Sequence, residues 1–106
     1  MVENINSSVL EDMIESNKVV IADFYATWCG PCKMMHPISE ECAAGQTDIN
    51  FVRLDVDENM EYAQKAAIQF VPTFIIYAGG KEVARKSGYI PKEEFELFVK
   101  LASQCK

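Results

Sequence analysis

The sequence predicts an α/β protein whose central mixed β-sheet is flanked by helices on both faces. Two observations support this fold class. The apolar run from Val19 to Ala26 does not alternate with polar residues, which is typical of a strand covered on both faces. A helical stretch from about Cys29 to Ala44 and a second strand from Phe51 to Val56 follow it, and this order predicts a parallel βαβ unit with a right-handed crossover.

The first helix is predicted before the apolar run. Ser8 to Glu11 has the form of a capping box, and Leu10, Met13 and Ile14 would lie on the apolar face of the helix that follows. The helix that starts near Cys29 is expected to end at Gly45, because glycine favours the backbone conformation that closes helices.

The second half of the chain predicts a short helix, a hairpin and a last helix. The short helix covers about Asn59 to Ala67. Two strands, Thr73 to Tyr77 and Glu82 to Lys86, flank a tight turn from Ala78 to Lys81 and predict an antiparallel hairpin. The last helix is expected to begin with Pro91 as its first residue. Its apolar stripe consists of Phe95, Phe98, Val99 and Ala102.

Length and composition predict one domain over residues 1–106. The chain is 49% hydrophobic and 25% charged, which is ordinary globular usage. Its net charge is −6 and its basic residues are scattered, which disfavours nucleic acid and anionic membranes as partners. Neither a signal-peptide pattern nor a long apolar segment is present, so we expect a soluble, cytoplasmic protein. In such a reducing compartment, a close cysteine pair usually serves catalysis or metal binding.

The segment Cys29-Gly30-Pro31-Cys32 carries the chemistry. Cys29 falls at the start of a helix, where free backbone N–H groups and the helix dipole stabilise a thiolate. We therefore expect Cys29 to be an exposed, acidic nucleophile and Cys32 to be a shielded resolving thiol. Gly30 would let a partner backbone approach, and Pro31 fits the first turn because its missing N–H would be unpaired there.

Two other interpretations of the cysteines compete with a redox pair. Cys29, Cys32, His36 and Cys42 could nominally bind zinc. In a helix, however, Cys42 would lie about 15 Å along the axis from Cys32, too far for one tetrahedral site. Inert packing of two small apolar side chains would leave the helix-start position of Cys29 unexplained. The residues favour a redox pair.

Asp23 interrupts the apolar strand, where a charge is costly. A buried carboxylate without a cationic partner raises its pKa, which makes Asp23 a candidate proton acceptor for Cys32. The alternative is an Asp23 side chain that faces solvent or pairs with Arg53 on the neighbouring strand.

The dipeptide Val71-Pro72 begins the third predicted strand. Proline cannot donate to a sheet ladder, and a bond that precedes proline is the one linkage where the cis form is cheap. A cis bond here would turn backbone groups outward, ready to pair with an extended peptide. These residues alone do not decide between cis and trans.

Three segments, DFYATWCGPCKMMHP, FVPTFIIYAGG and KSGYI, occur in this order, and with them the chain resembles the thioredoxin family over essentially all 106 residues. The resemblance implies a thioredoxin-like fold and an enzyme that reduces protein disulfides by dithiol–disulfide exchange. It implies that Cys29 attacks, Cys32 resolves, Asp23 is the buried acid and Pro72 is a cis-proline, with Cys29 and Cys32 forming the redox-active disulfide. The implied substrate-binding residues are Trp28, Gly30, Pro31, Val71, Pro72 and Gly88.

The resemblance also implies partners and a role. It implies a monomeric, general cytosolic electron donor in redox homeostasis, with no bound cofactor or metal, that acts on disulfide-containing proteins. Electrons would come from a thioredoxin reductase that depends on NADPH or ferredoxin. The alternatives are a disulfide oxidase or isomerase and a redox-active binding subunit. The Gly-Pro dipeptide between the cysteines resembles the reducing members.

Some residues outside the cysteine pair also bear on the resemblance. Pro37 matches a proline that bends the active-site helix. Arg53 stands where many members have a lysine, and a guanidinium cannot give up its proton. Tyr25 replaces a frequent tryptophan. Cys42 is expected to pack in its helix and Cys105 to be a mobile tail thiol, although either could form an intermolecular disulfide under oxidation.

Overall fold

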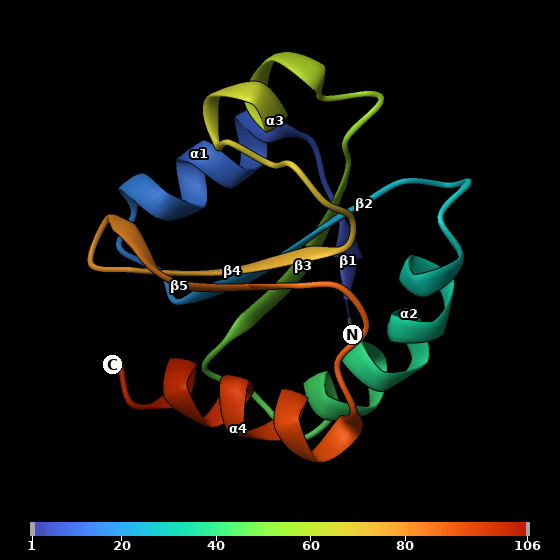
Figure 1. Cartoon of the computed structure of the whole chain (residues 1–106). Helices are drawn as coiled ribbons and strands as arrows, with labels where there is room; N and C mark the ends of the chain where they lie inside the picture. Colours follow the sequence, from blue (N-terminus) through green and yellow to red (C-terminus); the bar gives the residue numbers. More distant parts are fainter. Residues whose placement is uncertain (1, 106) are drawn as a thin grey trace.

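A five-stranded mixed sheet with helices on both faces makes up the described part of the chain, residues 2–105 of a computed structural model (Figure 1). The elements in chain order are β1 (Glu3–Asn4), α1 (Ser7–Glu15), β2 (Val20–Tyr25), α2 (Gly30–Ala43), β3 (Asn50–Asp55), α3 (Met60–Lys65), β4 (Thr73–Ala78), β5 (Lys81–Ser87) and α4 (Lys92–Ser103). A candidate membrane-spanning helix is absent from residues 2–105.

The strands are arranged in the order β1-β3-β2-β4-β5, with β2 at the centre. β2 is parallel to β3, and β3 is parallel to β1. β4 is antiparallel to both β2 and β5. The predicted βαβ unit and hairpin are therefore present, and the carboxyl ends of β2 and β3 meet at one edge of the sheet. Ligands of open α/β sheets bind beyond such an edge.

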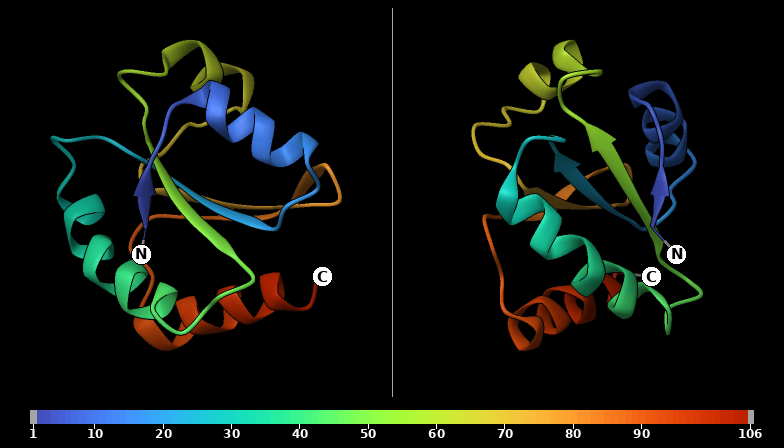
Figure 2. Two further views of the ribbon diagram at one scale, coloured as in Figure 1. Left: turned by 180° about the vertical axis from the view of Figure 1, so that it is seen from behind. Right: turned by 90° about the vertical axis from the view of Figure 1, so that its right-hand side faces the viewer.

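Two apolar cores lie on the two faces of the sheet. One core joins the sheet to α2 and α4 through residues such as Ile21, Met35 and Phe95. The other core contains Leu10 of α1 and Val20 of β2, and Tyr62 of α3 packs against it. Figure 2 shows the sheet between these two helical layers. All six residues of β2 are buried, which confirms the prediction of a strand covered on both faces.

The beginning of α1 differs from the prediction. Asn6, not Ser8, is the N-cap, and its Oδ1 atom accepts a hydrogen bond of 3.0 Å from the backbone N–H of Val9. Ser8 lies inside the first turn. Both residue types cap helices well, so the local pattern could not distinguish between two starts only two positions apart. Pro91 is likewise the N-cap of α4 and not its first helical residue.

Glycines shape the turn between β4 and β5. Gly79 and Gly80 have φ angles of 63° and 79°, a region in which residues with a Cβ atom are disfavoured. Positive φ at both central residues is the geometry of the tight hairpin turn that matches strand twist. The predicted turn from Ala78 to Lys81 is confirmed.

Candidate active site

Cys29 and Cys32 form a disulfide at the start of α2, just beyond the carboxyl end of β2. Their Cα atoms are 5.3 Å apart. Cys29 is the N-cap of α2, and its Sγ atom accepts a hydrogen bond of 3.2 Å from the backbone N–H of Cys32. In the reduced protein, this N–H group and the helix dipole favour a negative charge on Cys29.

The predicted exposure of Cys29 is wrong for this oxidised form. Cys29 is 4% exposed and Cys32 is 1% exposed, so both residues are buried. The physical reason is that the N-cap side chain folds over the first turn of α2, while Val71 packs against the cysteine pair. The expected order of accessibility holds, but the difference is small.

The loop before β4 lies against the disulfide. The Sγ atom of Cys29 is 3.5 Å from the carbonyl oxygen of Val71. The Val71-Pro72 bond is cis, as the family resemblance implied. The backbone N–H of Gly88 donates a hydrogen bond of 2.8 Å to the carbonyl of Pro72, and Gly88 has a φ of 86°. Pro72 is buried, so it shapes the backbone here, whereas Val71 and Gly88 are half-buried.

Trp28 forms the other side of the site. It is 69% exposed, and its Nε1–H group donates a hydrogen bond of 2.9 Å to Oδ2 of Asp57. Gly30 and Pro31 are also exposed. The predictions did not include Asp57. It lies just beyond β3, whose carboxyl end meets that of β2 at the same edge of the sheet, so the βαβ prediction could have pointed to it.

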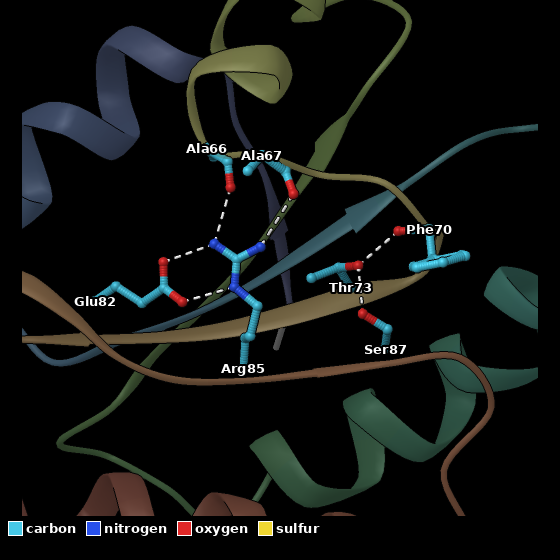
Figure 3. A network of polar contacts seen from close by, with 7 residues as sticks. All are labelled: Ala66, Ala67, Phe70, Thr73, Glu82, Arg85 and Ser87. Carbon is cyan, nitrogen blue, oxygen red and sulfur yellow. Dashed lines mark hydrogen bonds and ion pairs between the residues drawn. The ribbon is translucent and has the colours of Figure 1, made fainter.

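A polar network supports the loop that carries Val71 (Figure 3). The hydroxyl of the buried Thr73 donates to the carbonyl of Phe70 at 2.5 Å and lies 2.9 Å from the Ser87 hydroxyl. The guanidinium of Arg85 donates to the carbonyls of Ala66 and Ala67 at 2.8 Å and 3.2 Å, at the end of α3. None of these contacts was predicted. The contacts of Thr73 with Ser87 and of Arg85 with Ala66 and Ala67 join residues 14 to 19 positions apart, which local sequence patterns do not connect.

Glu82 holds Arg85 in this position. Its two carboxylate oxygens accept hydrogen bonds of 2.6 Å and 2.7 Å from the Arg85 guanidinium, in a two-pronged pair. Such paired bonds orient a guanidinium more strictly than a single contact does. Hydrogen bonds from Arg85 therefore connect the end of α3 to the edge strand β5.

Asp23 is 1% exposed and lies on the face of β2 that α2 covers. Neither of its carboxylate oxygens has a hydrogen-bond partner among the described residues. Burial raises the pKa of Asp23 to about 7, against a smaller opposing effect of the Arg53 charge. The alternative of a solvent-facing Asp23 is wrong, and the predicted buried acid with a raised pKa is confirmed.

Arg53 is the neighbour of Asp23 across the β2–β3 pair, but no ion pair joins them within residues 2–105. Its guanidinium instead lies over the ring of Tyr25, with Cζ 3.7 Å from the ring centroid. The Tyr25 hydroxyl accepts a hydrogen bond of 2.9 Å from Nδ2 of Asn4. The stack on Tyr25 keeps the positive charge of Arg53 near Asp23, and the Tyr25 ring does not neutralise that charge.

The nominal zinc ligands do not converge. His36 contacts Glu40, with 3.5 Å between Nε2 and Oε2, and Cys42 packs against the core. Among residues 2–105 no group of three or more histidine, cysteine, aspartate or glutamate side chains could hold a metal ion. Cys105 also packs against the core, and its Sγ atom contacts the carbonyl of Leu101 at 3.4 Å, so its side chain does not extend from the fold as the expected tail thiol would.

Comparison with known proteins identifies the family to which this chain belongs. The thioredoxin family model matches residues 1–101. The chain belongs to the thioredoxin family. It is 41% identical over 95 residues to a thioredoxin of Mycoplasmoides gallisepticum, covering 90% of this chain and 95% of that protein. The crystal structure of thioredoxin NaTrxh from Nicotiana alata has a TM-score of 0.86 and 40% identity, with 95% of this chain and 91% of that chain covered.

A third relative joins thioredoxin to a reductase. The bifunctional thioredoxin reductase/thioredoxin of Mycobacterium leprae is 43% identical over 88 residues, which cover 82% of this chain and 19% of that protein. Thioredoxins are protein-disulfide oxidoreductases that need no bound cofactor. The Cys29–Cys32 pair at the start of α2 gives this thioredoxin that activity, by dithiol–disulfide exchange.

Proposed function

We propose that this thioredoxin is a general electron donor that reduces disulfides of many proteins in the cytoplasm and receives its electrons from a thioredoxin reductase. The observation that carries the proposal is the N-cap position of Cys29, whose Sγ atom accepts the Cys32 N–H while lying next to the Val71 carbonyl. The start of α2 stabilises a Cys29 thiolate at this position. The loop that carries Val71 lies beside the sulfur atom, where a substrate chain would bind.

The first step is attack by the Cys29 thiolate on one sulfur of the substrate disulfide. An S–S bond forms between Cys29 and the substrate, the substrate S–S bond breaks, and the second substrate sulfur leaves as a thiolate. The substrate chain at the Cys29 sulfur would contact the residues around it, which are Trp28, Gly30, Pro31, Val71 and Gly88. Pro72 would act through its backbone, because its side chain is buried.

The second step is attack by Cys32 on the Cys29 sulfur. The Cys29–Cys32 bond forms, the mixed disulfide breaks, and the substrate leaves with two electrons and, after protonation, two thiols. Asp23 takes the Cys32 proton, which suits a carboxylate with a pKa of about 7 and no hydrogen-bond partner among the described residues. The reverse transfer would accompany reduction of Cys32.

The partners follow from this cycle. A thioredoxin reductase that uses NADPH or ferredoxin would reduce the Cys29–Cys32 disulfide, and the fused reductase of the Mycobacterium leprae relative supports such a partner. Cys42 and Cys105 are free thiols, which fits a reducing compartment. We further propose that the chain acts as a monomer and as a single domain.

The test is reduction of insulin disulfides with NADPH and a thioredoxin reductase. Cys29→Ser should abolish turnover, and Cys32→Ser should accumulate mixed disulfides on Cys29. A variant with both Cys42→Ser and Cys105→Ser is the matched control and should keep full activity. Turnover close to that of the unmodified protein in the Cys29 variant would overturn the mechanism, and net disulfide formation in reduced substrates would favour an oxidase.

A further inference from the structure

Phe70 is an exposed aromatic residue on the loop beside the disulfide. It is 66% exposed, although phenylalanine is among the residues most often found in cores. It directly precedes Val71, whose carbonyl oxygen lies 3.5 Å from the Sγ atom of Cys29. Its ring has no ring partner among the aromatic contacts of residues 2–105. The side chain therefore does little for the fold.

The backbone at Phe70 is held in place from both directions. On one side, Ile68 packs against the core and Arg85 binds the carbonyls of Ala66 and Ala67. On the other side, the Thr73 hydroxyl donates to the Phe70 carbonyl, and Figure 3 shows the ring extending away from the Thr73–Ser87 pair. A ring on a backbone held in this way can bind apolar surface without the cost of ordering the loop.

The position of Phe70 would let its ring contact the residue next to a substrate cysteine. Disulfide-bonded cysteines have Cα atoms about 5.5 Å apart, and the Sγ atom of Cys29 lies 3.5 Å from the Val71 carbonyl oxygen, so a cysteine joined to Cys29 can lie beside Val71. Consecutive Cα atoms are about 3.8 Å apart in both chains. A residue adjacent to the substrate cysteine therefore comes within reach of the Phe70 ring, on the side of Cys29 that Val71 occupies.

We propose that Phe70 is a specificity-determining residue that favours substrate disulfides with a large apolar residue next to the attacked cysteine. This inference rests on the proposed reduction of protein disulfides and names the substrate class of that same site. Contact with a large apolar side chain would remove apolar surface of both partners from water. A serine at the same substrate position would gain nothing from the ring.

The experiment uses the reduced full chain and two cyclic disulfide peptides. One peptide has leucine next to each cysteine, and the other has serine there. Second-order rate constants for reduction are measured by stopped flow. We expect a preference for the leucine peptide of about tenfold, equivalent to about 1.4 kcal/mol. Phe70→Ala should reduce this preference to less than about twofold and leave the rate with the serine peptide nearly unchanged.

The matched control is Leu97→Ala, which removes an equally exposed apolar side chain from α4. It should keep the leucine preference. Equal loss of rate with both peptides in Phe70→Ala, or a preference that survives the substitution, would overturn the inference. So would equal rates for the two peptides with the unmodified chain. If the unmodified chain reduced neither peptide nor insulin, the proposed function would fail instead.

Discussion

At the scale of single residues, Asp23 links the stability of the protein to pH. Its carboxyl group is buried without a hydrogen-bond partner among the described residues, and its pKa is raised to about 7. The unfolded chain loses this proton near the ordinary pKa of 3.8, whereas the folded chain keeps it to about 7. The folded state therefore loses stability as the pH rises through this window, and the loss is complete above it.

Substitution of Asp23 by asparagine tests this linkage. The variant lacks the ionisation, so its free energy of unfolding relative to the unmodified protein should increase by up to about 4 kcal/mol between about pH 4 and about pH 8. Comparison of the two pH values cancels the constant cost of a buried amide. Urea unfolding of the oxidised proteins measures the change. A stability difference that is the same at both values would show that Asp23 ionises normally.

Arg53 provides a second test at the residue scale. Its charge opposes the effect of burial on Asp23, so Arg53→Gln should raise the pKa of Asp23 further above 7. Arg53→Lys keeps the charge and is the control, with a smaller expected shift. The carboxyl carbon of Asp23 in a 13C NMR titration reports the pKa directly. An unchanged pKa in the glutamine variant would mean that the Arg53 charge does not reach Asp23.

At the scale of elements, α1 offers a paired test of helix capping. Asn6→Ala removes the side chain that accepts the Val9 N–H and should cost about 1 kcal/mol of stability. Ser8→Ala changes a residue inside the first turn and should be neutral or slightly stabilising, because alanine has the higher helix propensity. Thermal or urea unfolding compares them. A larger loss from Ser8→Ala would place the helix start where the capping-box pattern had predicted it.

The hydrogen bonds that connect the end of α3 to β5 give a further prediction at this scale. Arg85→Met removes the two bonds to the carbonyls of Ala66 and Ala67 and the pair with Glu82, and should cost about 1 to 2 kcal/mol. Amide hydrogen exchange in α3 should become faster. Glu82→Gln keeps the carbonyl bonds and should have a smaller effect on both measurements. Equal effects of the two substitutions would assign the stabilisation to the Arg85–Glu82 ion pair alone.

The elements also show what local sequence can and cannot predict. β2 and α2 were predictable because an apolar run without alternation, a proline that fits the first turn of a helix and a helix-ending glycine are local signals. β1 was missed, since two residues carry no periodicity, and its pairing with β3 is visible only in the folded chain. The burial of Cys29 depends on Val71, which is 42 positions away. The position of Arg53 over Tyr25 likewise needs the register of β2 and β3.

At the scale of the whole molecule, the edges of the sheet support the proposed monomer. β1 is only two residues long, and β5 carries charged residues along its exposed length, among them Lys81, Glu82 and Arg85. Short or charged edge strands discourage pairing between chains. We expect sedimentation equilibrium of the reduced protein to give the monomer mass of 11.9 kDa. A dimer that persists under reducing conditions would contradict this expectation.

Oxidation provides the control for that measurement. Burial, with Glu96 as a further cause, raises the pKa of the Cys42 thiol, so this residue is a weak nucleophile near neutral pH. Any dimer formed under oxidant should therefore be lost in Cys105→Ser more than in Cys42→Ser. Loss only in the Cys42 variant would show that the core-packed thiol becomes accessible.

The hydrogen bond between Trp28 and Asp57 has an optical consequence. Trp28 is the one tryptophan in the 106 residues, it is exposed, and it adjoins the Cys29–Cys32 disulfide in the sequence. Indole fluorescence depends on the immediate surroundings of the ring. All tryptophan emission from this chain therefore originates beside the reacting sulfur atoms, and its intensity can follow their oxidation state without an added label.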